Sequence, residues 1–519
     1  MTTTPAERAS SLAAILDHWA ETTPDGPALT MDEVTVRWRE LAERSRGVAA
    51  ALQGAGVEPG DRVGFYDKNS LEYFEVLFGA AMLNAVTVAV NWRLAPDEIV
   101  AVADDAGLRV LVVAAEFADV ARRLEAEVPS LEKVVVIEEE YASWRDAGGP
   151  VERREASPDD VAMLLYTSGT TGEPKGVMID NRNLGALLAR SDELGFTLDG
   201  AAIVGMPLFH MGGVGWALWS LYQGSHSVVM REFDPRRLLE LIAEHRVTHV
   251  LLVPAMLLVV TGTPEAATAD LSTVRVMVYG AAPISEELLE VSLKLFDCDF
   301  YQVYGATETT GAVTWLRPED HRADGAAPPR LRSAGRAMTA VELRVVDTDS
   351  ELPVGADQIG EVWIRSAQVM KGYWNKPDAT AATVTDDGWY RTGDAGSLDA
   401  EGYLYLYDRV KDMIVTGAEN VYPIEVENVL MRHPAVADVA VIGVPSERWG
   451  EEVKAVVVRH PGEQVTAEEL IAFTRERLAG YKTPKSVDFL DVLPRNPSGK
   501  ILKKDLRAPY WAGRSRLIG

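Results

Sequence analysis

A hydroxyl-rich glycine loop is the part of the sequence whose residue types are best suited to chemistry. The run Tyr166-Thr-Ser-Gly-Thr-Thr-Gly-Glu-Pro-Lys-Gly176 lies between the apolar segments Val161-Ala-Met-Leu-Leu and Val177-Met-Ile, which predicts a strand, a loop and a second strand. Glycines let backbone N–H groups approach a polyphosphate, hydroxyls add donors, and Lys175 adds a mobile cation. A flexible surface loop is the alternative, because Gly/Ser/Thr clusters are common in loops.

Other segments further along the chain carry charged or aromatic groups that could bind a nucleotide. A carboxylate such as Glu308 suits a hard cation that bridges phosphate oxygens, and Asp394 could accept hydrogen bonds from both hydroxyls of a ribose. Taken singly, such residues are more often solvated charges, turns or linkers. Their interpretation therefore depends on the whole series, Gln302-Val-Tyr-Gly-Ala-Thr-Glu308, Tyr390-Arg-Thr-Gly-Asp394, Asp408-Arg-Val-Lys-Asp412 and Pro494-Arg-Asn-Pro-Ser-Gly-Lys-Ile-Leu-Lys-Lys504.

The glycine loop differs from one nucleotide-binding loop and resembles another. It is not the loop G-x-x-x-x-G-K-[ST], because Gly176 follows Lys175 where Ser or Thr is required. As a whole string, residues 166–176 resemble the signature loop of the adenylate-forming (AMP-binding) superfamily, which includes acyl-CoA synthetases, firefly-type luciferases and the adenylation domains of peptide synthetases. The later segments resemble further motifs of that family in the same order. The resemblance implies ATP phosphate contacts at Thr167, Ser168, Gly169, Thr170, Thr171 and Lys175.

The resemblance also assigns the residues around the adenine and the metal. In the family, an aromatic residue such as Tyr304 lies against the adenine, Thr307 contacts the phosphate and Glu308 helps to hold Mg²⁺, with Thr170 as the second implied metal contact. The segment Tyr279-Gly-Ala-Ala-Pro-Ile284 resembles the part of the family that passes between the adenine and the acyl group. Further implied nucleotide contacts are Gly280, Ala281, Gln302 and Gly305.

A third group of implied contacts lies closer to the C-terminus. Asp394 corresponds to the family's ribose ligand, and Arg409 corresponds to its second ribose and phosphate contact. Lys411 stands at the hinge position about which the family's C-terminal domain rotates. Gly417 and Ala418 match a loop that forms part of the tunnel for the CoA pantetheine. Many relatives in the CoA-ligase branch carry a second glycine in place of Ala418, so its methyl group could narrow that tunnel.

Lys500 corresponds to the family's adenylation lysine. The turn formed by Pro497-Ser-Gly would project Lys500 from a defined backbone position, whereas Lys503 and Lys504 are expected to be solvated. Attack of a carboxylate on the α-phosphate brings two anions together, so catalysis requires charge neutralisation and alignment. The resemblance implies that Lys500 bridges the two anions and that Mg²⁺ with Glu308 stabilises the departing pyrophosphate.

The implied activity is that of an AMP-forming acid–thiol ligase of fatty acid metabolism, an acyl- or aryl-CoA synthetase. ATP and Mg²⁺ activate a carboxylic acid to an acyl-adenylate, and CoA is the co-substrate that accepts the acyl group. An alternative is a stand-alone adenylating enzyme of secondary metabolism that loads another nucleophile or a carrier protein acting in trans. A non-catalytic nucleotide-binding protein is a third alternative, but it has no use for a transition-state lysine such as Lys500.

The acid-binding side is less well specified than the nucleotide side. The segment Pro207-Leu-Phe-His-Met-Gly-Gly213 resembles the family's pocket segment, where the histidine or its aromatic neighbour borders the acyl site. Peptide-synthetase domains carry an aspartate in this region to hold an amine, so His210 and Met211 argue against an α-amino acid. The apolar residues that follow could line the pocket or fill the core: Val214, Trp216 and Leu218.

Alternating strand-like and helix-like segments supply the framework that must position these groups. Apolar runs such as Arg62-Val-Gly-Phe-Tyr and Leu108-Arg-Val-Leu-Val-Val predict an α/β sheet with covering helices, and Ser11–Glu21 and Trp38–Gly54 have helical spacing. The stretch Arg317–Arg336 is expected to be a surface loop. Together with these patterns, the resemblance implies a large N-terminal multi-sheet α/β AMP-binding domain over residues 1–407, a hinge at 408–412, and a small mobile α+β lid over 413–519.

Composition excludes several other classes of protein. A formal charge of −27 over 519 residues disfavours a nucleic-acid partner. Cys298 is the only cysteine, so the chain can form neither a disulfide framework nor a cysteine zinc site. No apolar run reaches the roughly 18 residues of a spanning helix, and a cytoplasmic location is expected. The oligomeric state stays open, although homodimers are the commonest oligomers of soluble proteins. Peripheral membrane association stays open as well.

Overall fold

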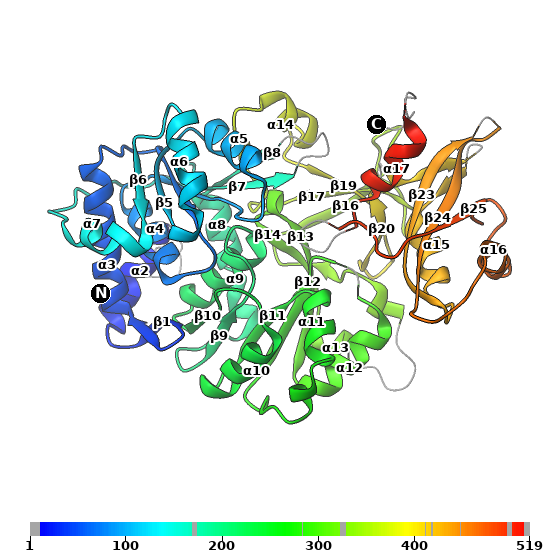
Figure 1. The fold of residues 1–519 in the computed structure, drawn as a ribbon, viewed down its shortest axis with the longest axis horizontal. Helices are drawn as coiled ribbons and strands as arrows, with labels where there is room; N and C mark the ends of the chain where they lie inside the picture. Colours follow the sequence, from blue (N-terminus) through cyan, green and yellow to red (C-terminus); the bar gives the residue numbers. More distant parts are fainter. Residues whose placement is uncertain are drawn as a thin grey trace. The chain divides into compact units, whose positions relative to one another are not determined.

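The structure is a computed structural model that describes residues 11–168, 174–282, 284–321, 329–409, 412–416, 419–446, 448–495 and 501–512. The chain forms two compact units, each assembled from two parts of the sequence (Figure 1). The first contains Met1–Glu342 and Arg365–Tyr390, and the second contains Leu343–Ile364 and Arg391–Gly519. The predicted boundary at 408–412 falls inside the second unit, and the hinge stays a prediction.

One sheet of the first unit has nine strands among the described residues, in the order β15-β14-β13-β12-β11-β9-β10-β1-β2. Its central neighbours β9 to β13 are parallel, as expected for strands connected by helices. The strands are β1 (Pro27–Met31), β2 (Val34–Arg37), β9 (Ala201–Val204), β10 (His226–Val229), β11 (His249–Leu252), β12 (Val276–Gly280), β13 (Asp299–Ala306), β14 (Gly311–Leu316) and β15 (Arg336–Ala337).

The other sheet of the first unit has seven strands among the described residues, in the order β18-β8-β7-β4-β3-β5-β6. Strands β3, β4, β5 and β6 are parallel, and β3, β4 and β5 are mostly buried, which explains the nearly continuous apolar sequences of these three strands. The strands are β3 (Arg62–Tyr66), β4 (Val86–Ala89), β5 (Leu108–Val113), β6 (Lys133–Val136), β7 (Val161–Ser168), β8 (Pro174–Asp180) and β18 (Gly372–Tyr373).

Helices cover these two sheets (Figure 1). They are α2 (Leu12–Thr22), α3 (Trp38–Gly54), α4 (Leu71–Met82), α5 (Pro96–Ala106), α6 (Ala118–Glu127), α7 (Ala142–Asp146), α8 (Asn181–Leu188), α9 (Met211–Tyr222), α10 (Pro235–Glu244), α11 (Pro254–Thr261), α12 (Glu286–Phe296), α13 (Pro318–His321) and α14 (Pro377–Thr383). Short turns of other helical types are η1 (Ala115–Phe117), η2 (Ile137–Tyr141), η3 (Ser191–Leu194), η4 (Pro264–Ala267), η5 (Thr307–Thr309) and η6 (Pro329–Arg332). Among the described residues, no helix has the length and apolar character needed to cross a lipid bilayer.

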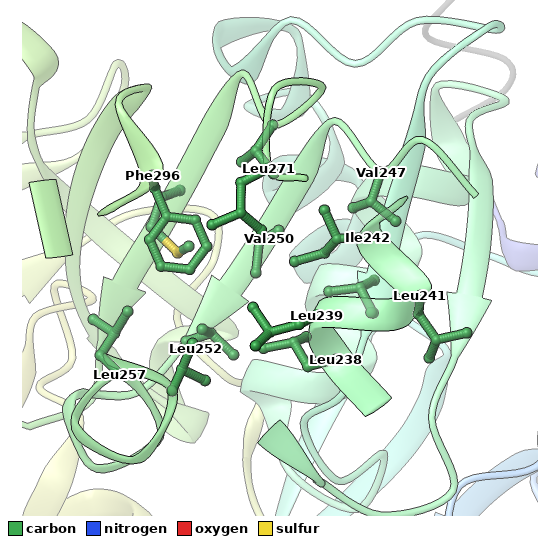
Figure 2. Packing of buried hydrophobic residues seen from close by; sticks show 14 of the residues in the cluster. Leu238, Leu239, Leu241, Ile242, Val247, Val250, Leu252, Leu257, Leu271 and Phe296 are labelled. Carbon is green, nitrogen blue, oxygen red and sulfur yellow. The ribbon is translucent and has the colours of Figure 1, made fainter. Parts of the chain in front are cut away.

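Helix α10 illustrates how the sequence builds the core of the first unit. Asp234 caps its first turn by accepting a hydrogen bond from Arg237 N–H, and Pro235 occupies the first helical position. The buried face of the helix packs over β11, with side chains from α12 and the neighbouring loops completing the cluster (Figure 2). Labelled members of this cluster are Leu238, Leu239, Leu241, Ile242, Val247, Val250, Leu252, Leu257, Leu271 and Phe296.

The second unit contains most of a four-stranded sheet and a separate α+β element. The four-stranded sheet has the order β16-β17-β19-β20, and in the other sheet the path β22-β21-β24-β23 is extended by β25, which pairs with β24. Their strands are β16 (Glu342–Val346), β17 (Gly360–Arg365), β19 (Tyr390–Leu398), β20 (Leu404–Arg409), β21 (Ile414–Thr416), β22 (Glu419–Val421), β23 (Val436–Ser446), β24 (Gly450–Arg459) and β25 (Ser486–Phe489). Its helices are α15 (Pro423–Leu430), α16 (Ala467–Arg475) and α17 (Lys503–Trp511).

The expected surface loop over residues 317–336 is wrong in part. Residues 318–321 form α13, and the His321 imidazole is 7% exposed. Its Nε2 lies 3.0 Å from the Tyr279 hydroxyl, while its Nδ1 lies 2.8 Å from the backbone oxygen of Arg317. The long-range contact with Tyr279 stabilises a short helix whose charged, proline-containing sequence alone favours a loop.

Candidate active site

The two strands that flank the glycine loop form an antiparallel pair. Their register runs from Val161 opposite Asp180 to Ser168 opposite Pro174, so the predicted strand–loop–strand order is confirmed. The Tyr166 hydroxyl donates a hydrogen bond to Asp105 Oδ2 at 2.6 Å. A Cβ atom added at Gly176 would lie 2.9 Å from the Tyr166 ring, so glycine is needed there. The predicted phosphate contacts Gly169, Thr170 and Thr171, and the side chain of Ser168, lie outside the described residues.

A tyrosine connects the loop lysine to the predicted metal carboxylate. Tyr373 lies on β18, which pairs with β8 in the register Tyr373 opposite Val177. The Lys175 Nζ atom lies 4.9 Å from the centroid of the Tyr373 ring, and the Tyr373 hydroxyl donates to Glu308 Oε1 at 2.9 Å. The structure therefore brings together two residues that are far apart in the sequence. Tyr373 itself was missed, because nothing in its local sequence indicates a contact with either partner.

Glu308 lies in the turn η5, which connects β13 to β14. The Thr309 hydroxyl holds this turn, since it accepts a hydrogen bond from Ala306 N–H at 2.8 Å and lies 2.8 Å from the Gly311 backbone oxygen. Thr310 adopts a left-handed conformation with φ of 48°. Both Thr307 and Glu308 are half-buried. The turn thus fixes the backbone of the carboxylate while leaving its side chain partly accessible to a ligand.

Close backbone approach characterises the predicted adenine segment. Gly280 on β12 lies opposite Val303 on β13, and an added Cβ would lie 2.3 Å from the Val303 backbone oxygen. At Gly305, an added Cβ would lie 1.9 Å from the Gly311 backbone oxygen. Ala281 is in the left-handed region with φ of 64°, which is uncommon for a residue with a side chain. At this end of the strands, Gly280 and Gly305 allow close backbone contacts, and Ala281 adopts a left-handed conformation. Uncommon backbone conformations of this kind cluster at ligand sites.

The remaining side chains of the adenine segment lie beside this strand end. The Tyr279 hydroxyl lies 3.3 Å from Gln302 Oε1, which ties Gln302 to the buried core. Tyr304 is half-buried and lies opposite Thr314 on β14. Thr167 is also half-buried, at the end of β7 opposite Lys175. Contacts of these residues with a nucleotide stay predictions.

His210 is the N-cap residue of α9, and its side chain makes no capping hydrogen bond. Its Nε2 atom is buried without a hydrogen-bond partner among the described residues. Burial, together with the positive charge of Arg93, lowers the pKa of His210 to about 4. The Arg93 guanidinium lies over the Phe209 ring at 5.9 Å, and the Phe209 and His210 rings are 4.4 Å apart. His210 is therefore a neutral imidazole with a free polar atom, suited to orient a ligand.

We predict that His210 does not act as a base that titrates near neutral pH. Its pKa of about 4 means that the neutral form persists as pH falls from 8 to about 5, and is lost only as pH falls through about 4. His210→Gln should therefore lower the rate of adenylate formation by a constant factor, on the order of tenfold for one lost polar contact. The measurement is the wild-type-to-variant rate ratio between about pH 6 and 8; a ratio that changes with an inflection near 6.5 would contradict the prediction.

The second unit contains the predicted ribose contacts. Asp394 on β19 lies opposite Arg409 on β20, so the register brings this pair together. The Asp394 N–H donates to the Thr392 hydroxyl at 2.9 Å, and that hydroxyl donates to the Val362 backbone oxygen at 2.7 Å, which fixes the turn. The Arg409 side chain and the predicted site residues Lys411, Gly417, Ala418 and Lys500 lie outside the described residues.

The structure bears on two further expectations, the solvation of the lysines near the C-terminus and the role of Trp216, for which the core and the pocket were both open. Lys503 was expected to be solvated, but its side chain is 12% exposed and its Nζ lies 2.9 Å from Glu427 Oε1. Lys504 is exposed, as predicted. Trp216 is buried, and its indole N–H donates to the Ile203 backbone oxygen at 2.9 Å, which favours a core role over a pocket role.

The donor set around Glu308 fits a Mg²⁺ ion that arrives with a nucleotide. Among the described residues, no group of three or more His, Cys, Asp or Glu side chains could hold a metal. Magnesium in phosphoryl-transfer sites is commonly bound by one or two carboxylates together with substrate phosphates. Glu308, half-buried near Lys175, provides such a carboxylate.

This fold and site define a class of enzymes that activate carboxylic acids with ATP. A sequence model described as "AMP-binding enzyme" matches residues 16–374, and one described as "AMP-binding enzyme C-terminal domain" matches residues 425–500. The chain therefore belongs to the AMP-binding, or adenylate-forming, enzyme family, which confirms the predicted resemblance and the predicted fold. It is accordingly an AMP-forming acid–thiol ligase.

Similar proteins cover nearly the whole chain. A fatty acid–[acyl-carrier-protein] ligase, ScoC, from Streptomyces coeruleorubidus is 40% identical over 507 residues, covering 96% of this chain and 96% of its own. A feruloyl-CoA synthase from an Amycolatopsis species is 38% identical, with 95% and 97% covered. The solved structure of a Mycobacterium tuberculosis fatty acyl CoA synthetase has a TM-score of 0.79 and 33% identity, with 98% and 100% covered. ATP-bound MatB from Rhodopseudomonas palustris has a TM-score of 0.87 and 29% identity, with 96% and 99% covered.

Proposed function

We propose that the protein is an acyl- or aryl-CoA synthetase that uses ATP and Mg²⁺ to form an acyl-adenylate and then transfers the acyl group to CoA. The observation that carries this proposal is the cluster of Lys175, Tyr373 and Glu308 beside the glycine loop. It combines a cation for phosphate oxygens with a carboxylate for the metal that accompanies them. The names of the similar proteins, most of which are CoA ligases or synthetases, support CoA as the acceptor.

In the first half-reaction, an oxygen of the substrate carboxylate attacks the α-phosphorus of ATP, and the bond from that phosphorus to pyrophosphate breaks. Lys500 neutralises the approaching carboxylate and α-phosphate oxygens, while Lys175 binds the phosphates. When bound at Glu308, Mg²⁺ supplies Lewis-acid stabilisation of the pyrophosphate oxygens. Asp394 accepts from the ribose hydroxyls, and Arg409 makes the second ribose contact, so that the α-phosphate is held in line for attack.

In the second half-reaction, the CoA sulfur attacks the acyl carbonyl carbon, and AMP leaves as the carbon–oxygen bond of the mixed anhydride breaks. The anhydride is already activated, so the protein needs to position the thiol and supply no covalent nucleophile. Rotation at Lys411 would exchange Lys500 for the loop that contains Gly417 and Ala418 between the two steps.

A carrier protein is the second candidate for the acceptor. This alternative is supported by ScoC, whose name describes transfer of a fatty acid to an acyl-carrier protein. The predicted cytoplasmic location and the oligomeric state stay predictions.

The substrate is proposed to be a fatty or aromatic carboxylic acid. The neutral His210 and the apolar Met211 provide no carboxylate for a substrate amine. The similar proteins include ligases named for fatty acids, ferulate, indoleacetate and coumarate. An activity assay with acids of these classes decides which of them is the substrate of this protein.

We predict that pyrophosphate release with ATP and Mg²⁺ depends strongly on both the acid and the acceptor. The assay uses a panel of fatty, aromatic and small acids, each with and without CoA. One class of acid should turn over at least about tenfold faster with CoA than without it, as expected when thioester formation clears the adenylate. Pyrophosphate release that is indifferent to CoA, but stimulated by a phosphopantetheinylated carrier protein, would replace CoA by the carrier. No release with any acid would contradict the proposed function.

A further inference from the structure

One short segment, residues 370–374, connects the strand that follows the glycine loop to the turn that carries Glu308. Met370 N–H donates to the Glu308 backbone oxygen at 2.8 Å. Lys371 N–H donates to the Met178 backbone oxygen at 3.0 Å, and Trp374 N–H donates to the Gly176 backbone oxygen at 2.8 Å. The segment is therefore hydrogen-bonded to both parts of the site, and its position sets their spacing.

The side chain of Tyr373 also connects the two parts of the site, through contacts with the side chains of Glu308 and Lys175. It is 6% exposed, and its hydroxyl donates to Glu308 Oε1 at 2.9 Å. The Lys175 ammonium group lies 4.9 Å from the ring centroid, within the range of a cation–π interaction. The Tyr373 backbone is fixed as well, because its N–H donates to the Thr380 hydroxyl at 2.9 Å.

We propose that Tyr373 is a positioning residue that holds the Glu308 carboxylate so that Oε2 is the oxygen presented to Mg²⁺. This proposal rests on the proposed function of Glu308 and goes beyond it by assigning the oxygen and its support. A carboxylate that is free to rotate presents either oxygen, whereas a hydrogen bond at Oε1 selects one orientation and leaves Oε2 for the metal. Outer-shell partners of this kind typically contribute 10- to 100-fold to metal affinity.

The stacking of Lys175 on the same ring extends the role of Tyr373 to the phosphate side. The phenol ring lies against the cation and its hydroxyl binds the carboxylate, so one rigid side chain keeps the two opposite charges apart. Direct pairing of Lys175 with Glu308 would neutralise both groups and leave neither for the MgATP complex. Tyr373 therefore keeps each charge available for its own ligand.

The test is the Tyr373→Phe variant, which keeps the ring and removes the hydroxyl. Its first readout is direct binding of Mn²⁺, as a spectroscopic substitute for Mg²⁺, to the enzyme with ATP and without acid, followed by electron paramagnetic resonance. We expect Mn²⁺ to bind about 10- to 100-fold more weakly than to the wild type. The second readout is pyrophosphate release, for which the Mg²⁺ concentration at half-maximal rate should rise while the KM for the acid stays unchanged.

Tyr141→Phe is the matched control. Tyr141 is 3% exposed, and its hydroxyl donates to Glu75 Oε2 at 2.9 Å, so the variant removes the same kind of buried hydrogen bond away from the site. We expect it to lower the melting temperature and leave Mn²⁺ affinity unchanged. An equal loss of Mn²⁺ affinity in both variants, or no loss in Tyr373→Phe, would overturn the proposal.

A double-mutant cycle with Glu308→Ala separates an effect of Tyr373→Phe that acts through Glu308 from a general structural effect. If Tyr373 acts through Glu308, its substitution should change Mn²⁺ affinity by less than about twofold once Glu308 is absent. A further loss of tenfold or more in the Glu308→Ala background would show an independent structural effect and refute the positioning role. If the wild type itself binds no Mn²⁺ with ATP, the proposed function of Glu308 fails, which is distinguishable from failure of Tyr373 alone.

Discussion

Lys500→Ala should lower the rate of acyl-adenylate formation by about 10²- to 10³-fold, while transfer from a supplied acyl-adenylate to the thiol changes little. The carboxylate and the α-phosphate repel each other, and a positioned cation is needed between them only in the first half-reaction. Loss of one such preorganised charge contact costs about 3–4 kcal/mol in the transition state. The effect should appear in the rate of adenylation more than in ATP affinity, because other groups bind the ground state.

The two half-reactions are measured separately to test this division. The first is followed as pyrophosphate release in a single turnover, and the second as thioester formation from a synthetic acyl-adenylate. Lys504→Ala is the control, because Lys504 is exposed and close in sequence. It should retain both activities within about twofold, as expected for a solvated charge. An equal loss in the two half-reactions of Lys500→Ala would contradict the assignment of Lys500 to adenylation.

Local sequence patterns predicted several elements of the first unit. The runs beginning at Arg62 and Leu108 form β3 and β5 over the predicted residues, since strands covered on both faces have continuous apolar sequences. The helix expected at Trp38–Gly54 is α3, because its apolar residues recur on one face. These elements are specified by short-range periodicity, and no knowledge of their neighbours was needed.

Long-range pairing explains what the sequence could not predict. The two-residue strand β18 exists only because it pairs with β8, which lies far away in the chain. No local pattern marks Tyr373 as a partner of Glu308 or Lys175. Likewise α13 depends on the contact of His321 with Tyr279, so its residues were assigned to a loop. In both cases tertiary contacts decide the structure and local preference does not.

The candidate site divides in the same way. The motif resemblance predicts phosphate, metal and ribose roles for Lys175, Glu308 and Asp394, because their residue types occur with this chemistry in a fixed order, and these roles stay predictions. It did not identify what orients them, because supporting groups are chosen by geometry and not by chemical type. The hydrogen bond from Tyr373 to Glu308 and that from Thr392 to Val362 belong to this second class. The sequence therefore indicates candidate reactive groups, whereas the residues that hydrogen-bond to these groups or fix their backbone are found only in the structure.

Gly305→Ala should lower pyrophosphate release by at least about 100-fold, although a methyl group adds no charge and removes none. An added Cβ at Gly305 would lie 1.9 Å from the backbone oxygen of Gly311 and 2.9 Å from Ala312 Cα. These neighbours are backbone atoms of β14, so no side-chain rotation can relieve the overlap. Strands β13 and β14 must separate, which displaces the turn η5 and the Glu308 carboxylate with it.

A displacement of this size is sufficient for the predicted loss, because a misplacement of about 1 Å in an aligned site can cost on the order of 10²-fold in rate. The variant is compared with Gly54→Ala, whose added Cβ meets no atom within 4 Å at the exposed end of α3. That control should keep its activity and gain a small amount of stability, since alanine favours a helix over glycine by roughly 1 kcal/mol. Melting temperature, ATP affinity and pyrophosphate release are measured for both proteins. Near-normal release in a folded Gly305→Ala variant would show that the close approach of β13 to β14 is not what positions Glu308, and the position of the carboxylate would then depend on other contacts, such as those of Thr309, Met370 and Tyr373.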